Sequence, residues 1–440
     1  MPSRSEVSYF GAGPAPLPTF VLETAAASLL NHENQGLGLG EISHRSPTAN
    51  KIIADAKTAL SHLLSIPDDE YETIFMQGGG SGEFSAVLQN CVVAWVERRR
   101  EKAVKELGEG KDKEVLERVR KEVQEMKVEY LVTGSWSLKA SQEAARLIGP
   151  KYVDVVMDAR KSDPKGKNKF GAVPELQSLS TEGRARKGYS ALTYFCDNET
   201  VDGVEFPKFP SELEGNEETE AGEERIVAAD MSSNFLSRTV DVKKYGIIFA
   251  GAQKNLGLPG ITVVIIRKSL LKLTTSAPVA FLHALSDLLP NIIPPIVFDL
   301  ATLAKNNSLY NTLPVFNLYV ATLVLQSLSA KYGHKRIGGQ GEISARKAEQ
   351  IYGTLDKYAN LYNVVPEKHA RSRMNVCFRL KGGDEEAEKK FVKGAEERGL
   401  LGVKGHRSVG GIRVSNYNAV GEEAVERLCQ FMVDFAEKEG

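Results

Sequence analysis

The strongest constraint on the fold is the repeated alternation of short, β-branched apolar runs with segments of helical spacing. Runs of this length and composition indicate buried strands. Strands that alternate with helices form a mainly parallel sheet with helices on both faces, so we expect an α/β fold. The expected strands lie at 72–76, 128–132, 152–156, 191–195, 226–230, in the apolar run that begins at 245, and at 261–266.

Several chemically informative residues follow directly after predicted strands. They are a glycine turn at 78–82, Trp136, Thr200, Asp230 and Lys254. In open parallel sheets, ligands bind outside the C-terminal ends of the strands. The shared placement of these residues predicts one site at that edge of the sheet.

The glycine turn connects the strand at 72–76 to a helix that begins near Phe84. Free backbone N–H groups at a helix N-terminus bind phosphate, and glycine allows the anion to approach closely. The turn lacks the Lys-Ser/Thr pair of a nucleotide P-loop. A structural tight turn explains the glycines equally well, so both interpretations remain open at this point.

Lys254 lies among small residues between two predicted core strands. A lysine close to a core is costly unless it is paired or chemically used. Desolvation makes such an amine nucleophilic, as in lysines that form Schiff bases. From this loop alone, an ordinary lysine that reaches out to water is the simpler interpretation.

Composition narrows the possible partners and compartments. Across 440 residues, 56 Lys+Arg balance 57 Asp+Glu, which demands neither nucleic acid nor an anionic membrane. The four cysteines are widely separated and form no CxxC pair, which argues against a zinc site and suits a reducing compartment. Without an apolar signal segment or a run of membrane-spanning length, we expect a cytoplasmic protein.

Two structural units are expected. A large domain at 16–335 carries a charged helical hairpin near 97–127, which we interpret as an insertion, and an acidic loop near 207–224. Residues 1–15 and 336–440 form a smaller α+β domain.

Nine segments, in order along nearly the whole chain, resemble those of the phosphoserine aminotransferases. This family belongs to the class V aminotransferases, which depend on pyridoxal 5′-phosphate (PLP) and adopt fold type I. The resemblance implies a seven-stranded, mainly parallel sheet, a smaller C-terminal domain and a homodimer with active sites at the subunit interface. The segments are 43–45, 78–82, 198–203, 229–233, 250–255, 311–312, 371–376, 405–407 and 410–413.

The resemblance assigns roles around the cofactor ring. Lys254 is implied to hold PLP as a Schiff base and to act as the general acid/base. Asp230 is implied to pair with the pyridinium nitrogen, which keeps the ring electron-accepting. Trp136 is implied to stack on the ring and Thr200 to hydrogen-bond near its hydroxyl oxygen.

The cofactor phosphate is implied to bind a second group of residues. Gly80 and Ser81 would offer backbone groups, together with the side chain of Gln253. Asn311 and Thr312 are implied to reach the same phosphate from the neighbouring subunit.

The implied reaction moves an amino group between L-glutamate and 3-phosphohydroxypyruvate, giving O-phospho-L-serine for serine biosynthesis. These substrates are anions, which arginine binds bidentately. Arg413 is implied to hold the α-carboxylate. His406 and Arg407, with Arg45 of the partner subunit, are implied to hold the substrate phosphate or the distal carboxylate of glutamate, and His44 is implied to assist.

One position departs from the pattern of some bacterial members. Ser81 stands where those members have an arginine, and Gln77 replaces a histidine before the glycines. The missing cation predicts weaker binding of the substrate phosphate and has little effect on cofactor binding.

Two rival functions remain at this stage. Another class V activity, alanine–glyoxylate aminotransfer or cysteine desulfuration, shares the cofactor, but desulfuration needs an exposed nucleophilic cysteine. Cys377 lies in a predicted strand and Cys91 on an apolar helix face, so neither suits that role. The second rival is a non-catalytic dimeric scaffold, against which the intact Lys254, Asp230 and Arg413 argue.

Overall fold

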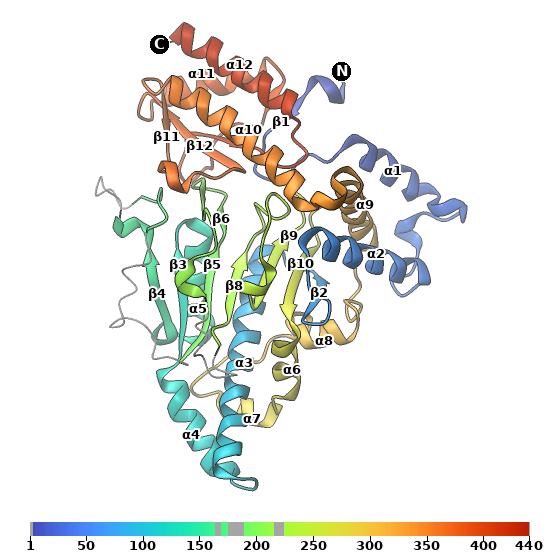
Figure 1. Cartoon of the computed structure of the whole chain (residues 1–440), viewed down its shortest axis with the longest axis vertical. Helices are drawn as coiled ribbons and strands as arrows, with labels where there is room; N and C mark the ends of the chain where they lie inside the picture. The colour runs from blue at the N-terminus through green and yellow to red at the C-terminus, as the bar shows by residue number, and fades with distance from the viewer. Residues whose placement is uncertain (1–2, 163–168, 175–188, 215–223, 440) are drawn as a thin grey trace.

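The computed structural model describes residues 3–162, 169–174, 189–214 and 224–439 and shows an α/β fold (Figure 1). Its centre is a sheet of seven strands. In spatial order the strands are β2 (Tyr71–Met76), β10 (Thr262–Arg267), β9 (Ile247–Gly251), β8 (Val227–Asp230), β5 (Ser190–Cys196), β3 (Lys127–Val132) and β4 (Val153–Asp158).

The sheet is parallel except at one strand. β8 pairs in parallel with β9 and with β5, and β3 pairs in parallel with β5 and with β4. β10 is antiparallel to both β2 and β9. The predicted seven-stranded, mainly parallel sheet is therefore confirmed, and the loop with Lys254 is the connection that reverses the chain from β9 into β10.

Helices cover both faces of the sheet, as the alternating pattern predicts. On one face, helices α2 and α9 pack in a core cluster with Phe75, Phe195 and Ile248 of the sheet. On the other face, α3 and α5 pack against Tyr130 and Tyr194. The helices of this unit are α1 (Thr19–Leu30), α2 (Pro47–Leu64), α3 (Gly79–Leu107), α4 (Asp112–Glu125), α5 (Ser135–Ile148), α6 (Lys268–Ser276), α7 (Val279–His283), α8 (Leu300–Lys305) and α9 (Val315–Tyr332).

The charged segment 97–127 forms the expected hairpin, made by the end of α3 and by α4. Its apolar residues Val115, Val119 and Val123 are buried and join the core beneath α3. Since α3 runs without a break from the glycine turn to Leu107, the hairpin extends a core helix. It lies at the end of the molecule opposite the C-terminal unit (Figure 1).

The C-terminal part forms a second sheet with its own core. β12 is central and antiparallel to both β11 and β14. Near the N-terminus, β1 pairs with β13, and Phe10 is buried in the same core cluster as Phe378 and Phe391. The elements are β1 (Ser8–Tyr9), α10 (Ile337–Lys357), β11 (Tyr362–Val364), β12 (Asn375–Leu380), α11 (Glu385–Glu396), β13 (Leu400–Leu401), β14 (Ile412–Ser415) and α12 (Glu422–Glu439).

The N-terminal strand thus packs with the C-terminal unit through β13 and the shared core, and the domain division at residues 15/16 and 335/336 stays a prediction. Most of the acidic loop, from 215 to 223, lies outside the described residues. Within the described part of the chain, no helix is long and apolar enough to cross a membrane.

Candidate active site

The glycine turn places the N-terminus of α3 at the C-terminal end of β2. Gly78 and Gly79 have φ angles of 140° and 61°, a region that side chains rarely adopt. The helix begins at Gly79 and no side chain caps its first turn. The free N–H groups of Gly80 and Ser81 therefore remain available to an anion, and the helix dipole favours negative charge there.

Asp230 ends β8 and is almost fully buried. Its Oδ1 accepts the backbone N–H of Ser232 at 2.8 Å, whereas the nearest recorded partner of Oδ2 is the Cys196 thiol at 3.9 Å. Burial raises the pKa of this carboxyl, and its bonds to Ser232 and the charge of Lys254 oppose that rise. A Cβ on Gly80 would lie 3.8 Å from Oδ2, so the glycine turn and the carboxylate face each other.

Lys254 lies at the same edge of the sheet and is half-buried. Its Nζ donates to the carbonyl of Ala12 at 2.5 Å and to the hydroxyl of Tyr417 at 3.3 Å. A side chain at Gly13 would lie 2.9 Å from the lysine Cδ and Cε atoms, so the glycine leaves room for the lysine. No carboxylate forms an ion pair with the amine among the described residues, which leaves it free to react.

Trp136 and Thr200 follow the neighbouring strands β3 and β5 of the sheet. Trp136 is in the first turn of α5, half-buried, with Lys139 Nζ 4.3 Å above the centre of its ring. Thr200 is buried, and its carbonyl accepts a hydrogen bond from Arg413 at 3.3 Å. Three elements thus bring an aromatic plane, a hydroxyl and a guanidinium to one edge of the sheet.

Positive groups gather beside Arg413. Burial lowers the pKa of His406, and so do the nearby charges of Arg413, Lys139 and Arg407, in that order. Arg413 and His406 line a cleft of about 1100 Å³ whose lining also includes Ser135 and residues of the C-terminal sheet. Lys254 and Asp230 do not line the cleft. The cleft is therefore bordered by the cations Arg413 and His406 and not by the lysine and the carboxylate.

Two predicted pairs lie apart from this group in the single chain. Arg45 is exposed, and the covered Nε2 atom of His44 has no hydrogen-bond partner among the described residues. Asn311 is exposed and donates to Gln77 Oε1 at 2.7 Å, and Gln77 donates to the Thr312 carbonyl at 3.2 Å. These contacts place Asn311 and Thr312 beside the glycine turn of their own chain.

Ser81 is exposed in the first turn of α3, and Gln253 is half-buried beside Lys254. The sequence predictions missed other residues of the site. Tyr417 contacts the amine of Lys254 but is 163 residues away, so no local pattern could indicate it. Glu83 is fully buried, and neither of its oxygens has a hydrogen-bond partner among the described residues.

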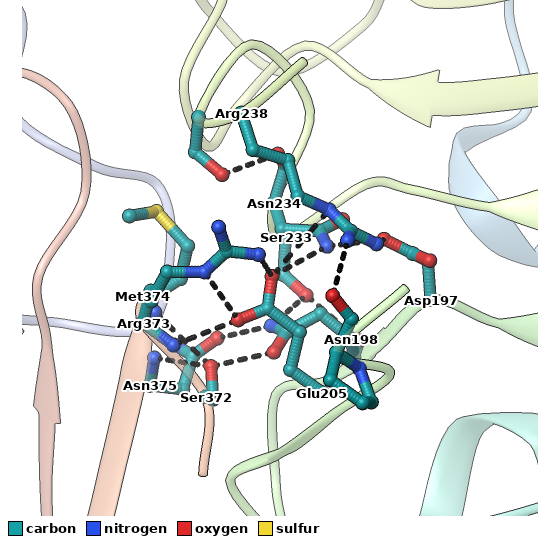
Figure 2. Close-up of polar contacts among 12 residues, drawn as sticks. Asp197, Asn198, Glu205, Ser233, Asn234, Arg238, Ser372, Arg373, Met374 and Asn375 are labelled. Atoms are coloured by element: carbon teal, nitrogen blue, oxygen red, sulfur yellow. Dashed lines mark hydrogen bonds and ion pairs between the residues drawn. The ribbon is translucent and has the colours of Figure 1, made fainter. Parts of the chain in front are cut away.

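A network of hydrogen bonds and ion pairs joins this edge of the sheet to the C-terminal unit (Figure 2). Glu205 accepts Arg373 Nη2 at 2.7 Å and Asn234 Nδ2 at 3.0 Å. Arg238 donates to Asp197. The network fixes segment 198–205, and with it Thr200, against residues 372–375 of the C-terminal unit.

This donor set fits PLP. The amine of Lys254 forms no ion pair among the described residues and can bond to an aldehyde, and Asp230 Oδ2, which the Cys196 thiol contacts at 3.9 Å, can accept an N–H. The uncapped N-terminus of α3 can accept a phosphate. Fold, lysine, carboxylate and anion cradle together define a PLP-dependent aminotransferase of class V, and the aminotransferase class-V family model matches residues 186–428.

Relatives specify the family within this class. Phosphoserine aminotransferase of Saccharomyces cerevisiae is 43% identical over 99% of this chain and 98% of its own length. The solved phosphoserine aminotransferase from Bacillus circulans subsp. alkalophilus is 34% identical, with a TM-score of 0.77 over 98% of both chains. A PLP-bound phosphoserine aminotransferase from Trichomonas vaginalis is also 34% identical, with a TM-score of 0.75 over 97% of this chain and 99% of its own. The chain belongs to the phosphoserine aminotransferase family, and its cofactor is PLP.

Proposed function

We propose that the protein transfers an amino group from L-glutamate to 3-phosphohydroxypyruvate, giving O-phospho-L-serine and 2-oxoglutarate, in the cytoplasmic synthesis of serine. Family membership supports the reaction. The observation that carries the proposal is the end of the sheet where the amine of Lys254, which forms no ion pair among the described residues, acts on the buried carboxylate of Asp230, with a separate cluster of cations around Arg413.

Lys254 and Asp230 are the proposed catalytic residues. When bound, PLP withdraws electrons from the substrate carbon that loses a proton. Asp230 would hold a proton on the ring nitrogen, because its buried carboxylate offers Oδ2 as the acceptor. The free amine of Lys254 would take the proton from the substrate Cα as a base and deliver it, as an acid, to the cofactor carbon C4′.

Cofactor binding follows from the surrounding surfaces. Gly80 and Ser81 at the N-terminus of α3 bind the cofactor phosphate with Gln253. Trp136 covers one face of the ring, and Thr200 holds the ring hydroxyl. Together these contacts orient the cofactor toward Lys254.

The cationic cluster selects the substrate. Arg413 binds the α-carboxylate, and its bond to the Thr200 carbonyl holds the guanidinium in place. His406 and Arg407 bind the substrate phosphate or the distal carboxylate of glutamate. With Ser81 in place of an arginine, these groups and Arg45 carry the binding of the substrate phosphate.

A homodimer completes the site in this proposal. His44 and Arg45 lie just before α2 in the chain, and α2 lies on the side of the molecule from which α1 projects (Figure 1). Phe20 is 51% and Leu30 is 82% exposed on that helix, which is apolar surface that a second copy can cover. Arg45 and His44 of one protomer then serve the site of the other. Asn311 and Thr312 do the same in this proposal, which requires their contacts with Gln77 of their own chain to lie at the subunit interface.

Subunit complementation tests this arrangement. Lys254→Ala and Arg45→Ala are inactive or weakly active alone, but a mixed dimer contains one site with both residues intact. Co-refolding the two variants should restore about a quarter of wild-type activity. No recovery, in samples that form mixed dimers, would show that Arg45 acts within its own chain.

The assay that tests the function measures glutamate-dependent formation of O-phospho-L-serine. We expect turnover with 3-phosphohydroxypyruvate to exceed turnover with glyoxylate by a factor of at least about 100. Both substrates carry a carboxylate, but only 3-phosphohydroxypyruvate also carries a phosphate that His406 and Arg407 can bind. Equal turnover would favour an alanine–glyoxylate type of activity. PLP binding without any amino transfer would favour a scaffold.

A further inference from the structure

The first turn of α5 is held by two carboxylates that come from another part of the chain. Its N-cap residue is Gly134, which has no side chain to offer. Instead, Glu199 accepts the N–H of Trp136 at 2.8 Å and the N–H of Ser137 at 2.9 Å. Asp202 accepts the N–H of Ser135 at 2.8 Å and its hydroxyl at 2.9 Å.

Glycine at position 134 leaves room for the side chain of Glu199. A Cβ at Gly134 would lie 2.3 Å from Glu199 Cγ, closer than atoms can approach. Other helices of the chain are capped by the residue just before them, such as Ser46 for α2 and Asp384 for α11. At α5 the capping residue lies more than 60 residues downstream. The cap therefore closes the N-terminal end of the helix and also holds the segment with Glu199 against the start of α5.

The same short segment also reaches the cationic part of the site. Thr200, between the two acids, accepts a hydrogen bond from Arg413 at 3.3 Å, and the charge of Arg413 acts on Asp202. Asp202 and Arg413 both line the cleft described above. Segment 199–202 therefore contacts the backbone of Trp136 on one side and the Arg413 side chain on the other.

Two neighbouring buried acids are more than a helix cap requires. Glu199 is fully buried and Asp202 is 8% exposed. Burial, followed by the charge of Asp202, raises the pKa of Glu199 to about 7, and burial raises the pKa of Asp202 as well. A single serine, threonine or aspartate caps a helix without this cost. The excess indicates a second task for the pair.

We propose that Glu199 and Asp202 are positioning residues that hold Trp136 and Arg413 in one fixed geometry. Trp136 is thereby set to cover one face of the cofactor ring, and Arg413 is set to bind the substrate carboxylate. The assignment of those two ligands rests on the proposed function. Neither acid needs to touch the reacting atoms.

Tryptophan fluorescence tests the first half of the inference without turnover. The chain has two tryptophans, so Trp95→Phe leaves Trp136 as the single reporter. In that background we expect Glu199→Gln to increase acrylamide quenching of Trp136 at least about twofold, and to weaken PLP affinity about tenfold, because the amide turns a donor toward the Trp136 N–H. Gly134→Ala, which displaces Glu199 and keeps its carboxyl, should reproduce both changes.

Asp202→Asn tests the second half and keeps an oxygen for the Ser135 amide. We expect the KM for glutamate to rise about fivefold to tenfold with less than a twofold change in kcat, since Arg413 loses its neighbouring charge. The matched control is Glu129→Gln, a buried acid that accepts two hydroxyls in another part of the sheet. It should change neither quenching, PLP affinity nor KM.

The outcomes separate the possibilities. Lower thermal stability in Glu199→Gln with unchanged quenching and PLP affinity would overturn the inference and leave a plain helix cap. Unchanged KM in Asp202→Asn would overturn the part that concerns Arg413. If wild-type protein forms no phosphoserine, the proposed function fails, while quenching and PLP affinity still decide whether the pair positions Trp136.

Discussion

Two groups of buried carboxylates near the C-terminal ends of the strands have opposite surroundings. Glu205 and Asp197 are surrounded by donors from Arg373, Asn234 and Arg238 (Figure 2). Glu83, beneath the glycine turn, is equally buried and has no hydrogen-bond partner among the described residues. Both oxygens of Glu205 thus have donors, whereas neither oxygen of Glu83 has one within the described part of the chain.

The pKa values follow this difference. Burial alone would raise the pKa of Glu205, but the charges of Arg373 and Arg238 outweigh it and lower the pKa below its ordinary value. Burial raises the pKa of Glu83 to about 9, and the negative charge of Asp230 acts in the same direction. Buried acids with donors on their oxygens connect the two units of the chain. Buried acids that lack such donors indicate a candidate ligand site.

The largest expected effect concerns Asp230. Asp230→Ala should lower kcat on the order of 10³-fold, because the ring nitrogen loses its partner in a buried site. The free energy of unfolding of the cofactor-free protein should not fall, since a buried carboxylate with few donors is itself costly. Steady-state kinetics and urea denaturation measure the two quantities. A large loss of stability with unchanged kcat would show that Asp230 has a structural role, like Glu205 and Asp197, and no catalytic one.

Arg238→Met should produce the opposite pattern. It leaves buried Asp197 without its cation and should lower the free energy of unfolding by about 3–5 kcal/mol. The matched control is Arg346→Met, which breaks an exposed pair with Glu422 and should cost less than about 1 kcal/mol. Urea denaturation measures the unfolding free energy of both variants. Equal losses would contradict the expectation that the buried pair contributes more to stability than the exposed pair.

Glu83→Gln should change how stability depends on pH. In wild type the folded state retains a proton between pH 4.5 and about 9 that the unfolded chain releases. Wild-type stability therefore falls as pH rises through that window, by at most about 1.4 kcal/mol per pH unit. Glutamine does not titrate, so the variant lacks this loss of stability. The unfolding free energy of the variant, relative to that of wild type, should therefore increase as pH rises. Parallel pH profiles would show that Glu83 is ionised and paired.

Glu205→Gln should show a smaller effect with the opposite sign. A lowered pKa contributes stability above the ordinary pKa of glutamate, and this contribution is lost as pH falls through the folded pKa. The stability difference between wild type and variant should therefore shrink under acidic conditions. Thermal unfolding at pH 3 and pH 7 measures it, and a difference that grows toward low pH would contradict the assignment.

Local patterns predicted much of the fold. The strands match their predicted bounds to within about two residues, since β-branched runs bounded by turns leave few alternatives. Helices α6 to α8 were not predicted. In the apolar stretch 288–303 around α8, prolines interrupt the periodicity, and its packing against the sheet is a tertiary effect.

The site was predictable where residues directly follow strands, as with Asp230 and Lys254. The partners of those residues were not. Tyr417 and Ala12 meet Lys254 only through the fold. The donors to Glu199 lie more than 60 residues upstream of it. Unpaired acids such as Glu83 are visible only once every neighbour has been placed.

The most direct test follows the nitrogen atom itself. Wild-type protein with PLP, ¹⁵N-glutamate and 3-phosphohydroxypyruvate should yield O-phospho-L-serine that carries ¹⁵N. Lys254→Ala should reduce that yield by a factor of about 10³ to 10⁴, because the proton at the substrate Cα loses its base. Unlabelled product, or labelled product formed equally well by Lys254→Ala, would contradict the account.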